Sequence, residues 1–126
     1  MLIITNYIAR HEMKPLGKVF NVSDILVGAK KIIKNLAIEI RHPGDGMSFR
    51  FFKVRIGKKG DGRMIAFFTT ANGNVVPLLI RAKKDKQYGE NMSSSNKFVT
   101  QQIKKNLLRV LEDIRDNRFE KFDIPS

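Results

Sequence analysis

The sequence of 126 residues has no cysteine and no tryptophan, and its acidic side chains are half as many as its basic ones. Without cysteine the chain can form neither a disulfide bond nor a thiolate metal site, which fits a reducing compartment. Only two histidines are present, and His11 and His42 lie far apart in the sequence, so a zinc site would need an unusual set of carboxylates. We therefore expect a cytoplasmic protein that uses no metal and no other cofactor.

Long apolar runs are also missing. No segment approaches the roughly 18 consecutive apolar residues that a membrane span requires, and the start of the chain does not resemble a signal peptide. Hydrophobic residues make up 42% of the chain and charged residues 29%, which is typical of a globular protein and not of a disordered one. The length fits one domain, and we expect 1–126 to form it.

The basic excess is concentrated in the middle of the chain. Of the formal net charge of +12, residues 47–86 hold +8, with ten Lys and Arg against two Asp and Glu. Residues 1–46 carry +3 and residues 87–126 carry +1. A run of charge is often only a solvated face, but this concentration within one expected sheet favours a surface that binds the phosphates of a nucleic acid.

The first third of the chain predicts a strand, a loop and a helix. Residues 2–9 alternate loosely, as an edge strand does, and residues 10–20 contain a proline and a glycine and resemble a loop. Ser23 can cap a helix that continues to Ile40 and ends at the sequence HPGDG, 42–46. The apolar face of this helix is formed by Ile25, Ala29, Ile32, Ile33, Leu36, Ala37 and Ile40.

Three strand-like runs follow, at 47–56, 63–70 and 75–81. The glycine-rich sequence GKKGDG joins the first two, and an Asn-Gly pair typical of hairpins joins the last two. Three consecutive strands with short connections form an antiparallel meander. Pro77 has no backbone N–H, so the third run either is an edge strand or carries a bulge at that point.

A second amphipathic helix follows a polar, basic loop at 82–95. Ser94 or Ser95 can cap this helix, and we expect it to end near Asn117. Its apolar face consists of Val99, Ile103, Leu107, Val110, Leu111 and Ile114.

The end of the chain carries three apolar side chains, Phe119, Phe122 and Ile124, which either pack back on the domain or contact a partner. The order of the elements predicts an α+β fold, in which helices pack on one face of a small antiparallel meander sheet.

The first run of the meander carries the candidate site, because its side chains alternate between two faces. Cations two residues apart on one face lie about 6–7 Å apart, a spacing that matches neighbouring phosphate oxygens of RNA. Taken alone, the pair is more typical of the polar side of a half-exposed antiparallel strand. One face carries Phe52, Val54 and Ile56, and the other carries Phe51, Lys53 and Arg55.

Further cations follow along the chain. Arg63 opens the second run, where a hairpin sets it beside the first, although it could also be a rim residue that pairs with Asp61. In the loop after the third run, Tyr88 can stack on an unpaired base or pack against the second helix. The residues expected to contact RNA around this site are Phe51, Lys58, Lys59, Arg81, Lys83 and Lys86.

Motifs for other chemistry are absent from the sequence. It contains no P-loop, no dinucleotide-binding glycine motif and no serine nucleophile motif. The sequence GKKGDG is followed by a strand and not by the helix that dinucleotide binding would need.

One pattern combines the sequence FFKVRIGKKGDGRMIAFF, then VVPLLIRAKKDK and an amphipathic helix. This pattern resembles the RelE/HigB superfamily of bacterial toxins, and most closely its HigB-like branch. The resemblance covers about residues 22–116 and leaves 117–126 as a C-terminal tail. It implies a RelE-like fold and the function of a type II toxin–antitoxin toxin, an mRNA endonuclease that acts on the ribosome or on free mRNA. The implied partners are mRNA and a cognate antitoxin protein.

The resemblance also implies a reaction without metal, in which the 2′-hydroxyl of the RNA attacks the adjacent phosphate. By position, Lys53 matches the general base, Arg55 a cation that assists the base or holds the backbone, and Arg63 the group that stabilises the phosphorane. Lys84 matches a general acid or charge stabiliser, and Tyr88 the stacking tyrosine. Some members use an acidic residue, histidine or tyrosine near the chain end, which has no clear counterpart here, so the general acid is unassigned.

Two other functions remain open. The same basic surface would serve a nucleic-acid-binding module that does not cleave, although the chain lacks the dense aromatic platform of common RNA-binding sheets. A ParE-like toxin that acts on gyrase would share the fold, but such relatives generally lack the full set of active-site cations. The presence of Lys53, Arg55, Arg63 and Lys84 together favours RNA cleavage.

Overall fold

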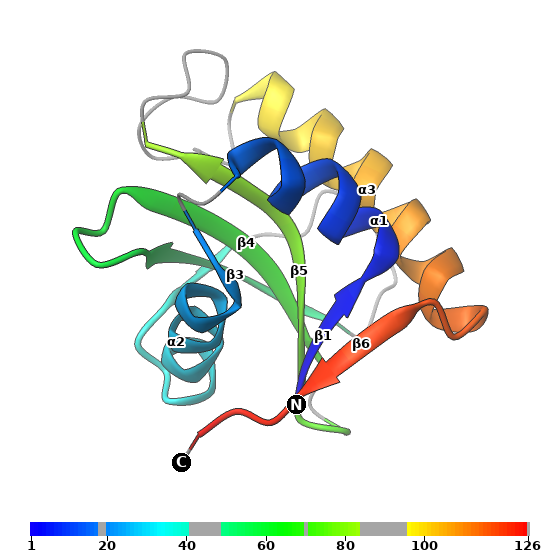
Figure 1. Ribbon diagram of the computed structural model, residues 1–126, viewed down its shortest axis with the longest axis horizontal. Helices are drawn as coiled ribbons and strands as arrows, with labels where there is room; N and C mark the ends of the chain where they lie inside the picture. Colours follow the sequence, from blue (N-terminus) through cyan, green and yellow to red (C-terminus); the bar gives the residue numbers. More distant parts are fainter. Residues whose placement is uncertain (18–19, 41–48, 70, 84–95, 126) are drawn as a thin grey trace.

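The computed structural model describes residues 1–17, 20–40, 49–69, 71–83 and 96–125 as an α+β fold built on a six-stranded, mostly antiparallel sheet (Figure 1). The expected α+β class is confirmed. Across the sheet the strand order is β2-β3-β4-β5-β1-β6. The bounds of the strands are β1 Leu2–Thr5, β2 Ile38–Ile40, β3 Arg50–Ile56, β4 Gly62–Thr69, β5 Asn74–Ala82 and β6 Phe119–Phe122.

Strands β3, β4 and β5 form the expected antiparallel meander. Its register shifts once, because Ile65 lies opposite Leu79 whereas the next residue, Ala66, lies opposite Pro77. Strand β5 therefore carries one extra residue, Leu78, and is an interior strand between β4 and β1. Of the two possibilities for Pro77, the bulge is correct.

Both ends of the chain meet in this sheet. Strand β1 pairs in parallel with β5 and antiparallel with β6, so it is an interior strand and not the expected edge strand. The C-terminal strand β6 covers that side, with Phe119 and Phe122 partly buried against the core. The tail thus packs back on the domain, which was one of the two possibilities.

A helical segment replaces the strand end and loop expected after Thr5. It begins as α1 (Asn6–Ile8), continues as a π-helical segment (Ala9–Met13) and ends in a 3-10 turn (Lys14–Leu16). The first amides of a helix have no partner within the helix and need acceptors from elsewhere. Residues far along the chain supply some of them, which local sequence patterns do not reveal.

Two side chains accept hydrogen bonds from the start of α1. The hydroxyl of Thr5 accepts from the amide of Ile8 at 3.3 Å, and the carboxylate of Asp113 accepts from the amide of Tyr7 at 2.7 Å. Asp113 is buried and also accepts from Nε of Arg118 at 2.9 Å. The contact of Asp113 joins the N-terminal helical segment to helix α3 (Lys97–Arg115).

Helix α2 (Val22–Ile33) begins at the capping box of Asn21 and Asp24, whose side chains accept each other's backbone amides. This helix was expected to continue to Ile40, but it ends at Ile33. Asn35 adopts a left-handed backbone conformation, with φ of 61°, which ends a helix. The residues that follow form β2, because pairing with β3 satisfies their backbone groups.

Helix α3 (Lys97–Arg115) carries the expected apolar face, with Val99, Ile103 and Val110 fully or almost fully buried. Asn96 caps it, since its side chain accepts from the amides of two residues in the first turn. The two serines that were expected to cap it, and the HPGDG sequence, lie outside the described residues.

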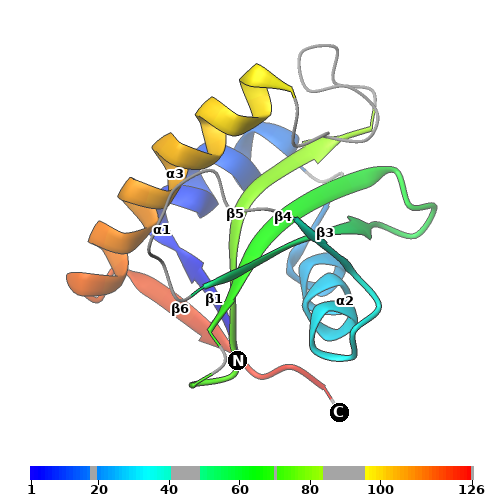
Figure 2. The ribbon, with the colours of Figure 1, turned by 180° about the vertical axis from the view of Figure 1, so that it is seen from behind.

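The helices lie on both faces of the sheet, and the expectation of one covered face was wrong. Figures 1 and 2 show α2 on one side and α1 and α3 on the other. Strand β4 shows the reason, because neighbouring residues that point to opposite faces, such as Met64 and Ile65, are both fully buried. Among the helices described, none is long and apolar enough to cross a membrane.

A close contact between α2 and the sheet gives a first prediction. A Cβ atom at Gly28 would lie 2.7 Å from Cγ2 of Ile56 and 3.0 Å from Cε of Met64, both buried. Gly28→Ala should therefore lower the free energy of unfolding by about 1–3 kcal/mol, despite the better helix propensity of alanine. Urea denaturation measures this change.

Val27→Ala serves as the control, since Val27 is the adjacent residue of α2 and is 55% exposed. It should change the free energy of unfolding by about 0.5 kcal/mol or less. A stabilised Gly28→Ala protein would show that α2 and the sheet are not in contact at this point.

Candidate phosphate-binding site

Three arginines from neighbouring strands form a row across one face of the sheet. Arg55 of β3 lies directly opposite Arg63 of β4, which lies directly opposite Arg81 of β5. Directly opposite residues point to the same face, and adjacent strands are about 4.8 Å apart. We call Arg55, Arg63 and Arg81 the arginine row. Like charges in such positions repel each other, so the fold must compensate them or leave them for an anionic ligand.

Arg63 is held by the turn that precedes it. Its Nη1 donates to the carbonyl oxygens of Gly60 at 2.6 Å and Gly62 at 3.0 Å, and the residue is only 4% exposed. The turn of GKKGDG therefore fixes the middle of the arginine row, and it presents a guanidinium whose position is set before any ligand binds.

Arg81 is held by an acidic residue of the N-terminal helical segment. Its Nη1 forms an ion pair with Glu12, which is 2% exposed and also accepts from the amide of Ile80 at 2.8 Å. The carboxylate compensates one charge of the arginine row, because a buried charge is tolerated only when it is paired. Arg55, at the other end of the row, is exposed to solvent.

Lys53 lies two residues before Arg55 on the same face of β3 and is half-buried. Burial lowers the pKa of its amine, and the positive charge of Arg63 lowers it further. Both effects disfavour the charged form. The neutral amine, which can accept a proton, is thus populated at a lower pH than in an ordinary lysine.

Lys53, Arg55 and Arg63, but not Arg81, line a groove at the edge of the sheet. Strand β2 ends its pairing with β3 at Ile38, opposite Lys53, and the groove opens beside the rest of β3. Its volume is about 680 Å³. None of the described residues that line it is acidic, which favours an anionic ligand. The lining consists of four cationic and four apolar residues, Lys31, Lys53, Arg55, Arg63, Leu36, Ala37, Ile38 and Val54.

Phe51 is not part of this surface, and its expected contact with RNA is wrong. It does point to the face of Lys53, but it is 1% exposed and its ring lies 6.1 Å from that of its cross-strand partner Phe67. The face is therefore apolar and covered at the start of β3, and cationic only toward its end.

The other expected contacts lie apart from the groove or outside the described residues. Lys58 and Lys59 are exposed in the turn, where they line a separate hollow beside Phe20. Lys83 is exposed after β5, and its amide donates to the carbonyl of Asp61. The remaining residues, Lys84, Lys86 and Tyr88, lie outside the described residues.

Sequence reasoning missed two residues of the site. Lys31 of α2, which lies outside the apolar face expected from the sequence, lines the groove and donates from Nζ to the carbonyl of Arg55 at 3.4 Å. Glu12, in the expected loop, compensates Arg81. An acidic residue in an otherwise basic and apolar stretch was the only signal for Glu12, and it does not identify the partner.

Within the part of the chain that the structure describes, no three histidine or carboxylate side chains lie close enough to hold a metal ion. Comparison of the chain with protein-family profiles, with curated proteins and with solved structures finds no match. We therefore infer function from the residues of the site itself.

The surroundings of Lys53 predict its titration. Its amine should lose its proton at a lower pH than an ordinary lysine, and Arg63→Gln should raise the pKa of Lys53 by removing one of the two causes. NMR titration of ¹³C-dimethylated lysines, with Lys53→Arg to assign the signal, measures this. A Lys53 signal that titrates at the ordinary pH of a lysine side chain would contradict this description of its surroundings.

The two carboxylates that pair with arginines of the sheet provide a matched comparison. Glu12→Gln should lower the free energy of unfolding by about 2–3 kcal/mol, because it weakens buried bonds to Arg81 and to the amide of Ile80. Glu39→Gln, which affects an exposed pair with Arg50, should cost much less. Equal losses in urea denaturation would show that Glu12 is not the buried partner of Arg81.

Proposed function

We propose that this chain is an endoribonuclease that cleaves mRNA through attack of the 2′-hydroxyl on the adjacent phosphate, and that it acts as the toxin of a type II toxin–antitoxin system. One observation carries the proposal: a lysine with a lowered pKa lies beside the arginine row, in a groove whose described lining contains no carboxylate. This combination supplies both a base and a binding site for a phosphate.

Lys53 acts as the general base. In its neutral form the amine accepts the proton of the 2′-hydroxyl, and the 2′-oxygen forms a bond to phosphorus. A lysine is suited to this step only when its pKa is lowered toward the working pH, which is the effect of its burial and of Arg63.

The arginines stabilise the charge that develops on the phosphorane. Arg55 is exposed at the groove and contacts the phosphate oxygens, while Arg63 provides a fixed positive charge from the groove floor. The bond from phosphorus to the 5′-oxygen then breaks. The products are a 2′,3′-cyclic phosphate and a 5′-hydroxyl, and the donor of the proton to the 5′-oxygen is unassigned.

An antitoxin protein is the second proposed partner. Leu36 and Ile38, at the edge of the groove, are 70% and 65% exposed. Apolar side chains this exposed beside a charged groove fit a surface that another protein covers. An antitoxin bound there would close the groove to RNA.

A nucleic-acid-binding module that does not cleave is the alternative that one observation favours. Arg63 is 4% exposed and bonded to the carbonyls of its own turn, an arrangement that suits structural support as well as catalysis. Such a module would bind RNA in the same groove, with an affinity that falls as salt concentration rises.

Cleavage of a synthetic single-stranded RNA distinguishes these functions. The protein should produce a cyclic phosphate end, in the presence of EDTA, and should not cut an RNA with 2′-deoxyribose at the cleaved position. Arg55→Gln should reduce the rate about 100-fold, because it removes a cation from the phosphate. Arg50→Gln is the control, since Arg50 lies on the same strand but on the opposite face, where it pairs with Glu39.

Expression in bacteria tests the same proposal in cells. Growth should stop, and mapping of mRNA 5′ ends should reveal new internal ends that disappear with Arg55→Gln. Intact mRNA with arrested growth would favour a gyrase-directed toxin, and salt-sensitive RNA binding without cleavage would favour the binding module. Either result would contradict the nuclease proposal.

A further inference from the structure

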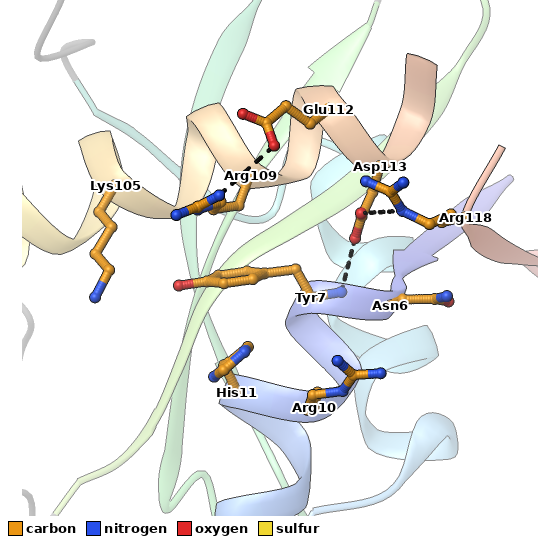
Figure 3. A pocket seen from close by; sticks show the side chains of 9 residues that line it. All are labelled: Asn6, Tyr7, Arg10, His11, Lys105, Arg109, Glu112, Asp113 and Arg118. Carbon is orange, nitrogen blue, oxygen red and sulfur yellow. Dashed lines mark hydrogen bonds and ion pairs between the residues drawn. The ribbon is translucent and has the colours of Figure 1, made fainter. Parts of the chain in front are cut away.

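A second cleft lies between the N-terminal helical segment and α3, next to the end of the arginine row. Its volume is about 520 Å³. Figure 3 shows Tyr7 and His11 on one wall, facing Lys105 and Arg109 of α3 on the other. None of these four residues belongs to the groove of the proposed catalytic site.

Two aromatic rings form one wall of the cleft. The ring centroids of Tyr7 and His11 are 4.4 Å apart, with an angle of 34° between the ring planes. The amide of Tyr7 donates to the buried carboxylate of Asp113, so the backbone at this point is fixed to α3. An aromatic ring such as a nucleobase can stack on the outer face of such a pair without reordering the backbone.

Two cations and the carboxylate of Glu112 lie on the opposite wall, which α3 forms. Lys105 and Arg109 are exposed on successive turns of α3, so they point to the same side of the helix. Arg109 lies 3.7 Å from Glu112, in a pair whose side chains are about half exposed. An exposed pair of this kind is weak, and an anion can displace the carboxylate from the guanidinium.

The cleft lies near Arg81, at the end of the arginine row. Glu12 binds Arg81 at the end of the row, and it lies one residue after His11 on the segment that carries Tyr7. Burial and the charge of Glu12 raise the pKa of Tyr7, while the charges of Arg109 and Arg81 act in the opposite direction. Arg81 and Arg109 are thus both close enough to influence the same hydroxyl.

We infer that this cleft binds one nucleotide of a single-stranded RNA, with the base stacked on Tyr7 and His11 and the phosphate between Lys105 and Arg109. A nucleotide is the ligand that combines a flat ring with an adjacent anion, and single-stranded RNA is the source of it that the proposed function supplies. The inference rests on the proposed function for the choice of RNA as the source of the nucleotide.

Binding of 5′-AMP tests the cleft by itself. Tyr7 and Tyr88 are the two tyrosines and the chain has no tryptophan, so Tyr88→Phe makes Tyr7 the only strong fluorophore. AMP should quench this fluorescence, and adenosine or inorganic phosphate should do so only at much higher concentration. The double substitution Lys105→Gln and Arg109→Gln should weaken AMP binding about tenfold or more.

The matched control is Lys104→Gln with Arg115→Gln, which removes the same charge from exposed positions of α3 outside the cleft. It should change AMP affinity less than twofold. No binding of AMP, or equal losses in the two double variants, would overturn the inference even if the protein cleaves RNA.

RNA length tests whether the nucleotide belongs to the same strand as the substrate. The cleft variant should weaken binding of an RNA about 12 nucleotides long, but not of one about 4 nucleotides long, which cannot occupy both sites. Equal effects on the two lengths would overturn the inference. The double substitution Lys53→Gln and Arg55→Gln should leave AMP binding intact, because neither residue lines the cleft. A protein that binds AMP but never cleaves RNA would contradict the proposed function and support nucleotide binding in the cleft.

Discussion

The register of the β3–β4–β5 meander is the constraint on which the rest of the site depends. It sets Arg55, Arg63 and Arg81 directly opposite each other, a position in which like charges repel. The carbonyls of the β3–β4 turn hold Arg63, and the buried carboxylate of Glu12 compensates Arg81. The fold thus compensates two of the three cations and leaves Arg55 exposed, and like charges placed side by side are typical of a functional site.

The same surroundings determine the chemistry of the neighbouring lysine. Burial is the larger cause of the lowered pKa of Lys53, and the positive charge of Arg63 lowers this pKa further. Both favour a neutral amine. One arrangement therefore gives the groove a phosphate-binding cation and a proton acceptor, and it does so with side chains that lie on two adjacent strands.

The sequence predicted what depends on local patterns. The meander, its two turns and the apolar face of α3 follow from alternation, Gly-rich turns and helical spacing, and Lys53, Arg55 and Arg63 do meet in one groove. The errors arise from distant contacts. The amide of Tyr7 is satisfied by Asp113, which lies 106 residues away, so the helical segment there looked like a loop. Phe51 is buried because helices cover both faces of the sheet, and single-strand alternation does not show which face is exposed.

If the chain is the proposed nuclease, the phosphates of RNA must bind in the groove that Lys53, Arg55 and Arg63 line. The most direct test is an NMR titration with a single-stranded RNA whose 2′-deoxyribose positions prevent cleavage, following the Nε–Hε signals of the arginines. The signals of Arg55 and Arg63 should shift together and saturate at the same RNA concentration, whereas that of Arg50 on the opposite face should stay in place. Shifts at Arg50 with unchanged signals at Arg55 and Arg63 would contradict binding in this groove.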